Sequence, residues 1–315
     1  MNTQSAMFSA EYDAGYARLQ AHQRHDVYIF TFGAVLNRFA LFHQGHWHNV
    51  IAAYADEHDA RARITERFAS AKLSPFACRL KNGHYHFNGT DYHTGSHHLN
   101  GHAIHGLLYN AEFAVTRIGS NATGAWVELS HDYTGNISGY PFPYRITIRY
   151  ELNENGLTLC TEVQNHSNQP MPLADGWHPY FTLGGQADDW TLQLNAKHRL
   201  QFDNDLLPTG NKVDDTRFTT PASLQNAELD HCFILTDHNA PACVLQNSLY
   251  RFSISPDANY PFMQVYLPPQ RDSIALENLS GAPDCFNNGI GLITLPAGAS
   301  HRFSTVYQLQ HLESA

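Results

Sequence analysis

The stretch RITIRYELNENGLTLCTEV, residues 145–163, decides the fold class. Its two halves, 145–152 and 157–163, alternate apolar and polar side chains with a period of two, which is typical of β-strands with one buried face. Asn155 and Gly156 lie between the two halves, and both residue types tolerate positive φ angles. The stretch therefore predicts an antiparallel β-hairpin that turns at Asn155 and Gly156.

Working outward, the same alternation recurs along the chain, whereas helical periodicity is rare. Further strands are expected at 27–32, 191–194, 232–236, 242–246, 251–255, 263–267, 273–276, 291–295 and 300–308. One short helix is expected around Ala60, Ile64 and Phe68, which are spaced by four residues and precede Pro75. Many strands with almost no helix indicate an all-β sandwich or barrel and argue against a parallel nucleotide-binding sheet.

No internal repeat and no linker rich in Pro, Gly or Ser divides the chain, so a single domain over residues 1–315 is expected. Hydrophobic residues make up 43% of the chain, enough for a core, and charged residues only 15%. The 19 basic and 29 acidic residues give a formal net charge of −10, without a cluster of Lys and Arg. This balance argues against nucleic acid and membrane surfaces as partners.

The sequence also carries a prediction about the compartment. The first residues contain no apolar segment followed by a small-residue cleavage site, so no signal peptide is expected, and no apolar run is long enough to span a bilayer. The five cysteines are widely spread and form no C-x-x-C pair. An odd number of scattered cysteines indicates reduced thiols, which favours a cytoplasmic protein.

Three short segments hold the residues best suited to chemistry. They are AIHGL at 103–107, DGWHPYFTL at 175–183 and ALENLSGAPD at 275–284. Glu277 ends an apolar run before a loop rich in Gly and Pro; it is either an exposed carboxylate at a strand end or a group held rigidly there and aimed into a cleft. His178 and His105 are either histidines packed in turns or working imidazoles.

A carboxylate and a histidine together provide the base and the acid that proton transfer on a sugar hydroxyl requires. At close range each is expected to stabilise the charged form of the other. The sequence does not show that Glu277 and His178 meet in space.

With these segments, the chain resembles the aldose 1-epimerase, or galactose mutarotase-like, family. The matching segments occur in the family's order and span residues 75 to 298. They are SPFACRLKNG at 74–83, the His105-Gly106 pair, HPYFTL at 178–183, LDHCF at 229–233 and ENLSGAPDCFN at 277–287. The resemblance implies a large antiparallel β-sandwich, called a supersandwich, with very little helix.

The resemblance also implies roles for individual residues. Glu277 would remove the proton of the C1 hydroxyl, His178 would protonate the ring oxygen, and His105 would bind and polarise near that oxygen. Arg79 and Asp230 would hold sugar hydroxyls through charge-assisted hydrogen bonds.

Trp177 or a nearby aromatic ring would stack on the sugar. The implied partner is a small sugar substrate, the implied oligomeric state is a monomer or homodimer, and no metal or organic cofactor is expected because only protons move.

The chain departs from the common family pattern at a few positions. Asn278 stands where a proline usually follows the glutamate, and Cys78 stands where an asparagine commonly precedes the arginine. Leu107 and Leu108 replace the usual aromatic and small residues after the first histidine motif. These departures bear on the identity of the sugar more than on the reaction, because the acid–base residue types are retained.

Four alternatives remain open at this stage. The histidines crowded between His84 and His105 have spacings found in zinc sites, although Gly95 and Gly101 would break a helix there. A hexose-6-phosphate 1-epimerase would need cations, for which Arg38, Arg79 and Lys81 are the candidates. A glycoside hydrolase would need a second carboxylate, for which Asp175 is the candidate. A non-catalytic carbohydrate-binding protein could use the same fold.

Overall fold

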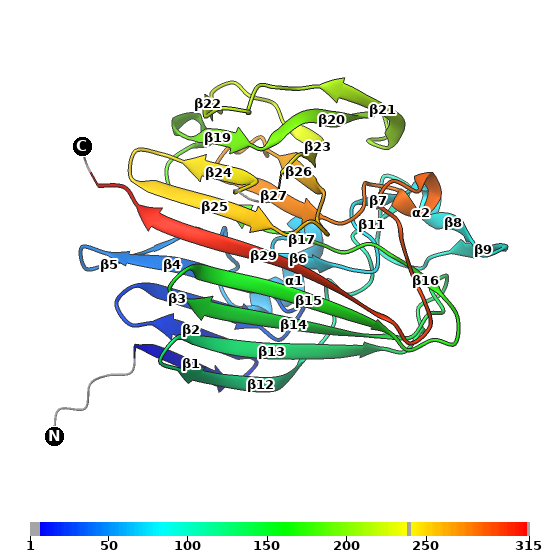
Figure 1. The fold of residues 1–315 in the computed structure, drawn as a ribbon, viewed down its shortest axis with the longest axis horizontal. Helices are drawn as coiled ribbons and strands as arrows, with labels where there is room; N and C mark the ends of the chain where they lie inside the picture. The colour runs from blue at the N-terminus through cyan, green and yellow to red at the C-terminus, as the bar shows by residue number, and fades with distance from the viewer. Residues whose placement is uncertain (1–6, 238–240, 314–315) are drawn as a thin grey trace.

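The structure, a computed structural model, describes residues 7–237 and 241–313. A nine-stranded antiparallel sheet runs across the molecule (Figure 1). In spatial order its strands are β12 (Ala114–Asn121), β13 (Gly124–Tyr133), β14 (Tyr144–Asn153), β15 (Gly156–Asn165), β29 (Ser300–His311), β25 (Tyr250–Pro256), β24 (Cys243–Gln246), β19 (Thr191–Leu194) and β22 (Ala222–Ser223).

Two further sheets make up the rest of the sandwich. The first is a five-stranded meander of β1 (Phe8–Asp13), β2 (Tyr16–Ala21), β3 (His25–Phe30), β4 (Leu36–His43) and β5 (His46–Asn49). The second has the order β21 (Pro208–Asp214), β20 (Ala196–Phe202), β23 (Asp230–Leu235), β26 (Phe262–Tyr266), β27 (Ile274–Leu279), β17 (Gly176–His178) and β6 (Ala71–Leu73), with β18 (Tyr180–Phe181) also paired to β27. The expected all-β sandwich is confirmed.

The remaining elements are short. The small strands are β7 (Arg79–Leu80), β8 (His84–Phe87), β9 (Thr90–His93), β10 (His98–Leu99), β11 (His102–Ile104), β16 (Met171–Leu173) and β28 (Ile293–Leu295). The α-helices of the described residues are α1 (Glu57–Arg67) and α2 (Cys285–Asn288), and single 3₁₀ turns cover Lys81–Gly83 and Ala187–Asp189. Neither α-helix has the length and apolar character that crossing a bilayer requires.

The predicted hairpin exists as β14 and β15, but its turn lies one residue earlier than expected. Asn153 pairs with Gly156, so Glu154 and Asn155 form the loop and Gly156 begins the second strand. Gly156 has φ of +120°, and a Cβ atom there would lie 2.2 Å from the carbonyl oxygen of Tyr307 on β29. The glycine is therefore required by the close approach of a third strand rather than by the turn itself.

The alternation of residues 145–152 has the expected consequence. Ile146, Ile148, Tyr150 and Leu152 are all fully buried, because side chains two apart along a strand share one face of the sheet. They belong to a hydrophobic core that extends along the chain from Phe8 to Leu309. The single domain expected over residues 1–315 stays a prediction.

The predicted helix is α1, and its ends follow capping rules. The Asp56 side chain accepts a hydrogen bond from the amide of Asp59 at 2.8 Å, which satisfies a free donor of the first turn. Ala60 and Ile64 are buried as expected. Phe68 ends the helix in a left-handed conformation with φ of 52°. This cap turns the chain toward β6, the strand next to β17.

A buried ion pair ties β6 to the segment that enters β17. Lys72 Nζ lies 2.5 Å from Asp175 Oδ1, and both side chains are fully shielded from solvent. Nζ also donates to the carbonyl oxygen of Gly176 at 3.1 Å, and the Tyr260 hydroxyl donates to Asp175 Oδ1 at 2.6 Å. Burial lowers the pKa of Lys72 to about 8, although the Asp175 charge opposes this shift. The pair lies behind His178, the C-terminal residue of β17.

We expect Lys72→Met to lower the free energy of unfolding by about 3–5 kcal/mol, because it leaves the Asp175 carboxylate buried without a counter-charge. Urea denaturation followed by circular dichroism measures this loss. The matched control is Arg145→Met, which breaks the Arg145–Asp132 pair, whose side chains are 48% and 55% exposed. Exposed pairs contribute little, so the control should lose far less. Equal losses in the two variants would contradict a stabilising role for the buried pair.

Candidate active site

A pocket of about 490 Å³ opens where strands β23, β26, β27 and β17 meet the end of α1 and the segment after β11. Five of the residues singled out in the sequence line it together. They are Arg79, His105, His178, Asp230 and Glu277. These residues lie up to 198 positions apart, counted from Arg79 to Glu277, so only the fold brings them together.

Glu277 lies inside β27 and not at the strand end expected from the sequence. β27 continues to Leu279 because Asn278 keeps its place in the ladder and pairs with Met263 of β26. Glu277 itself pairs with Gln264, and its side chain is 2% exposed. A strand interior holds a side chain more firmly than a loop does, so the carboxyl group has a defined direction into the pocket.

His178 projects from β17 onto the same face as Glu277. Its Nε2 atom lies 3.4 Å from Glu277 Oε1, and its backbone carbonyl accepts a hydrogen bond from the amide of Ser70 at 2.9 Å. The next residue, Pro179, accepts a bond from the amide of Leu276 at 3.3 Å. The imidazole and the carboxyl group are therefore positioned by the same sheet.

His105 reaches the pocket through a strained turn. Its φ is +61°, and the following Gly106 has φ of +75°. A Cβ atom at Gly106 would lie 2.3 Å from the carbonyl oxygen of Ser74, so only glycine fits there. The turn directs the His105 ring against the edge of His178, with ring centroids 4.7 Å apart at 85°. Phe68 packs on its other side, with centroids 4.7 Å apart.

Arg79 and Asp230 supply charge at the other side of the pocket. Asp230 begins β23, and its Oδ1 accepts a hydrogen bond of 2.6 Å from Gln264 Nε2. The guanidinium of half-buried Arg79 makes no hydrogen bond to any residue that the structure describes. An arginine that lines an open pocket and whose guanidinium has no partner among the described residues is suited to a polar ligand.

Trp177 lies on the opposite face of β17 and does not line the pocket. It is 2% exposed and packs in the core, 4.3 Å from Lys72 Nζ to the ring centre and 6.0 Å between ring centroids to Tyr150. Adjacent residues of a strand point to opposite faces, so a strand that presents His178 to the pocket must bury Trp177. The prediction that Trp177 stacks on a sugar ring is therefore wrong, because it placed this side chain on the pocket face of β17. The aromatic rings that line the pocket are Phe68, Tyr180 and Tyr266.

Burial dominates the electrostatics of the pocket. It raises the pKa of Glu277 well above its usual value, with the nearby Asp230 charge adding to the rise and Arg79 opposing it. It lowers the pKa of His178 to about 4 and that of His105 well below the normal range. The sequence-based expectation that the acid and the base stabilise each other's charged forms is thus outweighed by desolvation.

The consequence is that the two groups differ less in proton affinity than they would in water. In water a histidine holds its proton more tightly than a glutamate, but burial shifts both pKa values in the direction that removes this difference. Buried groups this close titrate as a unit, so we assign the proton to the His178–Glu277 pair. Glu277 Oε2 and His178 Nδ1 have no hydrogen-bond partner among the described residues. Both atoms therefore keep unused hydrogen-bonding capacity.

Two other residues that line the pocket, Gln264 and Arg67, were not predicted from the sequence. Gln264 is a polar residue in the otherwise apolar strand predicted at 263–267, and that interruption is the signal that could have identified it. It bonds Asp230 and leaves its Oε1 atom unpartnered. Arg67 at the end of α1 also lines the pocket, where its Nη2 atom donates to Ser273 Oγ at 2.9 Å and its guanidinium lies 4.5 Å above the Tyr180 ring. No sequence motif marks Arg67.

The histidines between 84 and 102 do not form a ligand cluster with the spacing of a metal site. Within the described ranges, the group of three potential ligands with atoms within 4.8 Å of one another is His105, His178 and Glu277. Of the other histidines of this region, His97 lies in the segment before β10, and the rest lie on the hairpin of β8 and β9 or the short strands β10 and β11. His102 Nδ1 accepts from the amide of Asn82 at 3.0 Å, a purely structural role.

Asp175 is excluded as the second carboxylate of a glycoside hydrolase. It is fully buried in the ion pair with Lys72, on the core side of the sheet. Of the cations considered for a phosphate group, Arg38 bonds Asp26 on β3 and Lys81 lies outside the pocket lining, so only Arg79 remains, joined by Arg67.

Comparisons with known sequences agree with this geometry. The sequence model of the family described as aldose 1-epimerase matches residues 17–308. An uncharacterised Escherichia coli protein, YihR, is 30% identical over 244 residues, which cover 75% of this chain and 77% of that protein. An aldose 1-epimerase of Streptococcus thermophilus is 26% identical over 207 residues, 55% of this chain and 59% of that enzyme.

Solved structures share the fold. A galactose mutarotase-like protein of Clostridium acetobutylicum superimposes with a TM-score of 0.82 at 16% identity, covering 97% of this chain and 98% of that one. The galactose 1-epimerase of Lactobacillus acidophilus gives a TM-score of 0.79 at 21% identity, covering 96% and 98% of the two chains. Together with the family match over residues 17–308, these likenesses lead to one conclusion: the chain belongs to the aldose 1-epimerase family.

Proposed function

We propose that this protein is an isomerase that interconverts the α and β anomers of a free hexose or related aldose. The observation that carries the proposal is the 3.4 Å contact between His178 Nε2 and Glu277 Oε1 inside a pocket that His105 also lines. Membership of the aldose 1-epimerase family supports the same reaction class. A cytoplasmic location and a monomeric or homodimeric state stay predictions.

The proposed reaction moves two protons and breaks one carbon–oxygen bond. Glu277 as carboxylate removes the proton of the C1 hydroxyl, and the C1–ring oxygen bond breaks as C1 becomes a carbonyl. His178 as imidazolium donates a proton to the leaving ring oxygen. Rotation about the C1–C2 bond exposes the other carbonyl face. Closure returns the proton from Glu277 to the C1 oxygen and the ring hydroxyl proton to His178.

The pair suits this cycle because it holds one proton throughout. When the sugar ring opens, His178 gives up one proton and Glu277 takes up another. Ring closure reverses both transfers. Burial makes the carboxylate–imidazolium form and the neutral form more nearly equal in energy than they would be in water. A proton that must travel in both directions between two groups moves fastest when neither group binds it much more tightly.

The neighbouring residues are proposed to hold the sugar. Burial keeps His105 neutral. One nitrogen of its imidazole, the unpartnered Nδ1 or Nε2, binds near the ring oxygen of the sugar. Arg79 donates to hydroxyls, and Asp230 and the free Oε1 of Gln264 accept from them. Only protons and the substrate's own electrons move, so we propose that no metal or organic cofactor takes part.

A second candidate substrate is an aldose that carries an anionic group, such as a hexose 6-phosphate. The observation that favours it is the presence of two arginines, Arg67 and Arg79, along the pocket. Among the described residues neither arginine forms an ion pair, so both charges are available to a ligand. Polarimetry on fresh α-D-glucose, α-D-galactose and α-D-glucose 6-phosphate separates the free and phosphorylated substrates.

We expect Glu277→Gln to slow anomer interconversion by roughly 10²–10⁴-fold, the usual contribution of a general base, because an amide cannot accept the C1 proton. Optical rotation of a freshly dissolved α-sugar measures the rate. The control is Glu162→Gln on β15, a carboxyl-to-amide change outside the pocket, which should leave the rate unchanged. Near-normal turnover in the Glu277 variant would remove this residue from its role. Sugar binding without turnover in the unaltered protein would support a non-catalytic binding protein.

The pH dependence should reflect the buried imidazole. The active pair holds one proton, and a second proton on His178 would leave no base. Because burial lowers the pKa of His178 to about 4, kcat/KM should fall on acidification through an apparent pKa near 4 rather than 6.5. Circular dichroism at each pH confirms that the protein is still folded. An acid limb centred at 6.5 would show that His178 titrates as an exposed histidine does.

Exhaustive dialysis against EDTA should leave the rate of anomer interconversion unchanged, because the proposed chemistry needs no Lewis acid. The rate before and after dialysis is compared with that of a sample to which Zn²⁺ is returned. Loss of activity on dialysis and recovery with the metal would contradict cofactor-free catalysis. The three convergent groups His105, His178 and Glu277 would then be the ligands to test first.

A further inference from the structure

A second, larger hollow lies on the outer face of the five-stranded sheet, away from the residues of the proposed active site. Its volume is about 780 Å³, compared with about 490 Å³ for the catalytic pocket. Strands β2 to β5 form its floor, and the N-terminal end of α1 forms one wall. The two hollows are bordered by opposite ends of α1, because Glu57 lines one and Arg67 lines the other.

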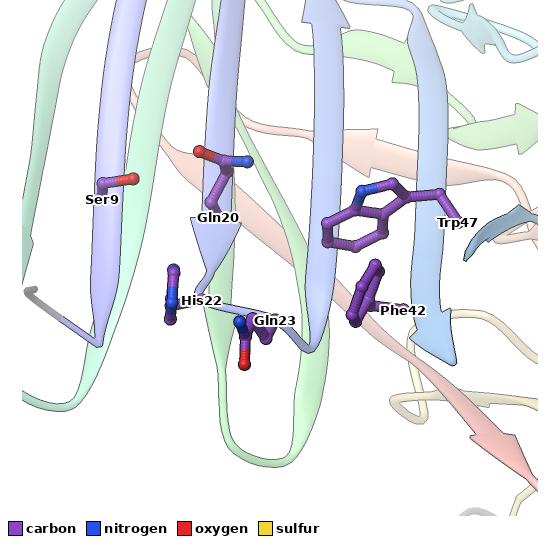
Figure 2. A pocket seen from close by; sticks show the side chains of 6 residues that line it. All are labelled: Ser9, Gln20, His22, Gln23, Phe42 and Trp47. Atoms are coloured by element: carbon purple, nitrogen blue, oxygen red, sulfur yellow. The ribbon is translucent and has the colours of Figure 1, made fainter. Parts of the chain in front are cut away.

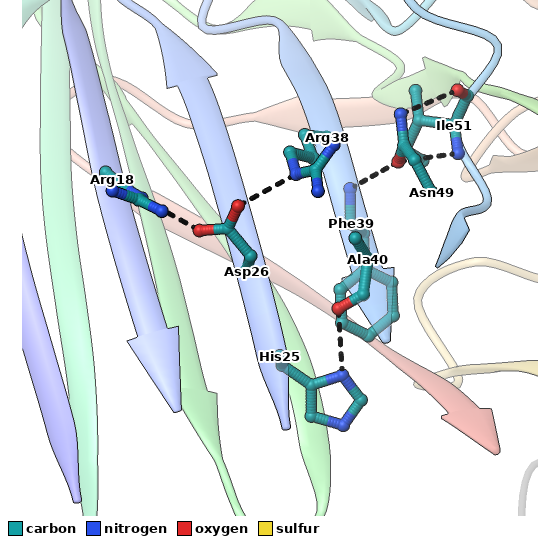
Figure 3. A network of polar contacts seen from close by, with 8 residues as sticks. All are labelled: Arg18, His25, Asp26, Arg38, Phe39, Ala40, Asn49 and Ile51. Carbon is teal, nitrogen blue, oxygen red and sulfur yellow. Dashed lines mark hydrogen bonds and ion pairs between the residues drawn. The ribbon is translucent and has the colours of Figure 1, made fainter. Parts of the chain in front are cut away.

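Polar side chains on the floor of this hollow form a network of hydrogen bonds and ion pairs (Figure 3). The Asp26 carboxylate is 4% exposed and accepts a hydrogen bond of 2.8 Å from the Nε atom of Arg18 on one side and of Arg38 on the other. Both arginines use only Nε, so their terminal amino groups have no hydrogen-bond partner among the described residues. Asp26 thus fixes two guanidinium groups while leaving their outer donors free for a ligand.

Aromatic rings surround these donors. The guanidinium groups of Arg18 and Arg38 lie 5.1 Å and 5.9 Å from the centre of the Tyr28 ring, and Tyr16 stacks on Tyr28 with centroids 5.6 Å apart. Trp47 flanks Arg38 at 5.8 Å and keeps 37% of its surface exposed. Fixed donors beside exposed rings combine hydrogen bonding with apolar contact area, the combination found in small-molecule sites.

Trp47 also lines a smaller neighbouring hollow of about 310 Å³. Figure 2 shows its ring tilted against Phe42, with Gln20 and Gln23 nearby on the same side of the sheet. The centroids of the Trp47 and Phe42 rings are 5.0 Å apart. One exposed indole therefore stands between two hollows, so a ligand with more than one ring could contact it from both sides.

The charges of the larger hollow argue for a neutral ligand. Two cations, Arg18 and Arg38, face three acids, Asp26, Asp56 and Glu57, and Arg61 lies 2.6 Å from Glu57, so the charges around the hollow balance. Balanced charges give a phosphate or a nucleic acid no net attraction there. A saccharide has hydroxyl groups that both donate and accept hydrogen bonds, and its ring carbons present apolar faces to aromatic side chains.

We propose that this outer hollow is a second, non-catalytic binding site for a neutral saccharide of two or more rings. Arg18 and Arg38 hydrogen bond its hydroxyls, while Tyr28 and Trp47 stack on its rings. The proposal is independent of the reaction assigned to the catalytic pocket, because the two sites share no lining residue.

The test uses fluorine NMR of the full-length protein labelled with fluorotryptophan, which reports separately on each of its four tryptophans. Trp47→Phe assigns the Trp47 signal. Maltotriose and lactose are titrated to about 100 mM, well above the millimolar dissociation constants typical of weak ligands. We expect a saturable shift of the Trp47 signal. No shift of this signal with either sugar overturns the proposal.

The matched control is Trp126 on β13, another tryptophan on a sheet surface, with the Arg149 guanidinium 5.2 Å from its ring centre but outside both hollows. Its signal should stay in place. Arg38→Ala should weaken saccharide binding at Trp47 by about tenfold or more, the usual effect of removing a charged hydrogen-bond donor, whereas Arg149→Ala should not change it.

Three further outcomes would reject the proposal. An equal effect of the two arginine variants would mean that the sugar acts non-specifically on surface tryptophans. A Trp47 signal that moves with protein concentration and not with sugar would mean that a second copy of the chain covers this face. Tighter binding of inorganic phosphate than of sugar would mean an anion site. The rate of anomer interconversion in Arg38→Ala should equal that of the unaltered protein, since Arg38 lies outside the catalytic pocket.

Discussion

The site depends on one contact, that between His178 and Glu277 at 3.4 Å in a pocket that shields both from water. Neither group would keep its direction or its perturbed proton affinity on a mobile loop. Both project from paired strands, β17 and β27, whose opposite faces are packed in the core. Rigid support on one side and an open pocket on the other are what allow a buried carboxyl group to face a ligand.

A buried ion pair lies beside the same sheet, on the side away from the pocket. Lys72 and Asp175 connect β6 to the start of β17, and Tyr260 completes the hydrogen bonding of the carboxylate. A buried pair of this kind is weak evidence for overall stability, because desolvation offsets much of its attraction. Its better-attested value is specificity: the pairing of β6 with β17 in another register would leave two buried charges unmatched. The pair thus joins β6 to β17, whereas the pairing of Gly176 with Leu279 sets β17 against β27, the strand of Glu277.

The two hollows show how one sheet architecture supports different kinds of site. The pocket around His178 and Glu277 buries its titratable groups, so their pKa values shift away from the usual ranges. The outer hollow leaves its arginines a quarter to a third exposed and pairs them with a buried acid, which fixes geometry without changing protonation chemistry. A helix only eleven residues long, α1, borders both. Binding in the second and chemistry in the first are therefore physically compatible in one small protein.

The sequence by itself determined the fold class, because a period of two in side-chain polarity admits only strands with one buried face, as Ile146, Ile148 and Tyr150 confirm. It also brought out His105, His178 and Glu277 through their local motifs. Tertiary structure decided the rest. It assigned Trp177 to the core. Alternate side chains of a strand face opposite sides of the sheet, but the side that is buried depends on strands that are distant in the sequence. Tertiary structure likewise placed Gln264 opposite Glu277 and shifted the pKa values of the site, because strand pairing and desolvation arise only when distant segments pack together.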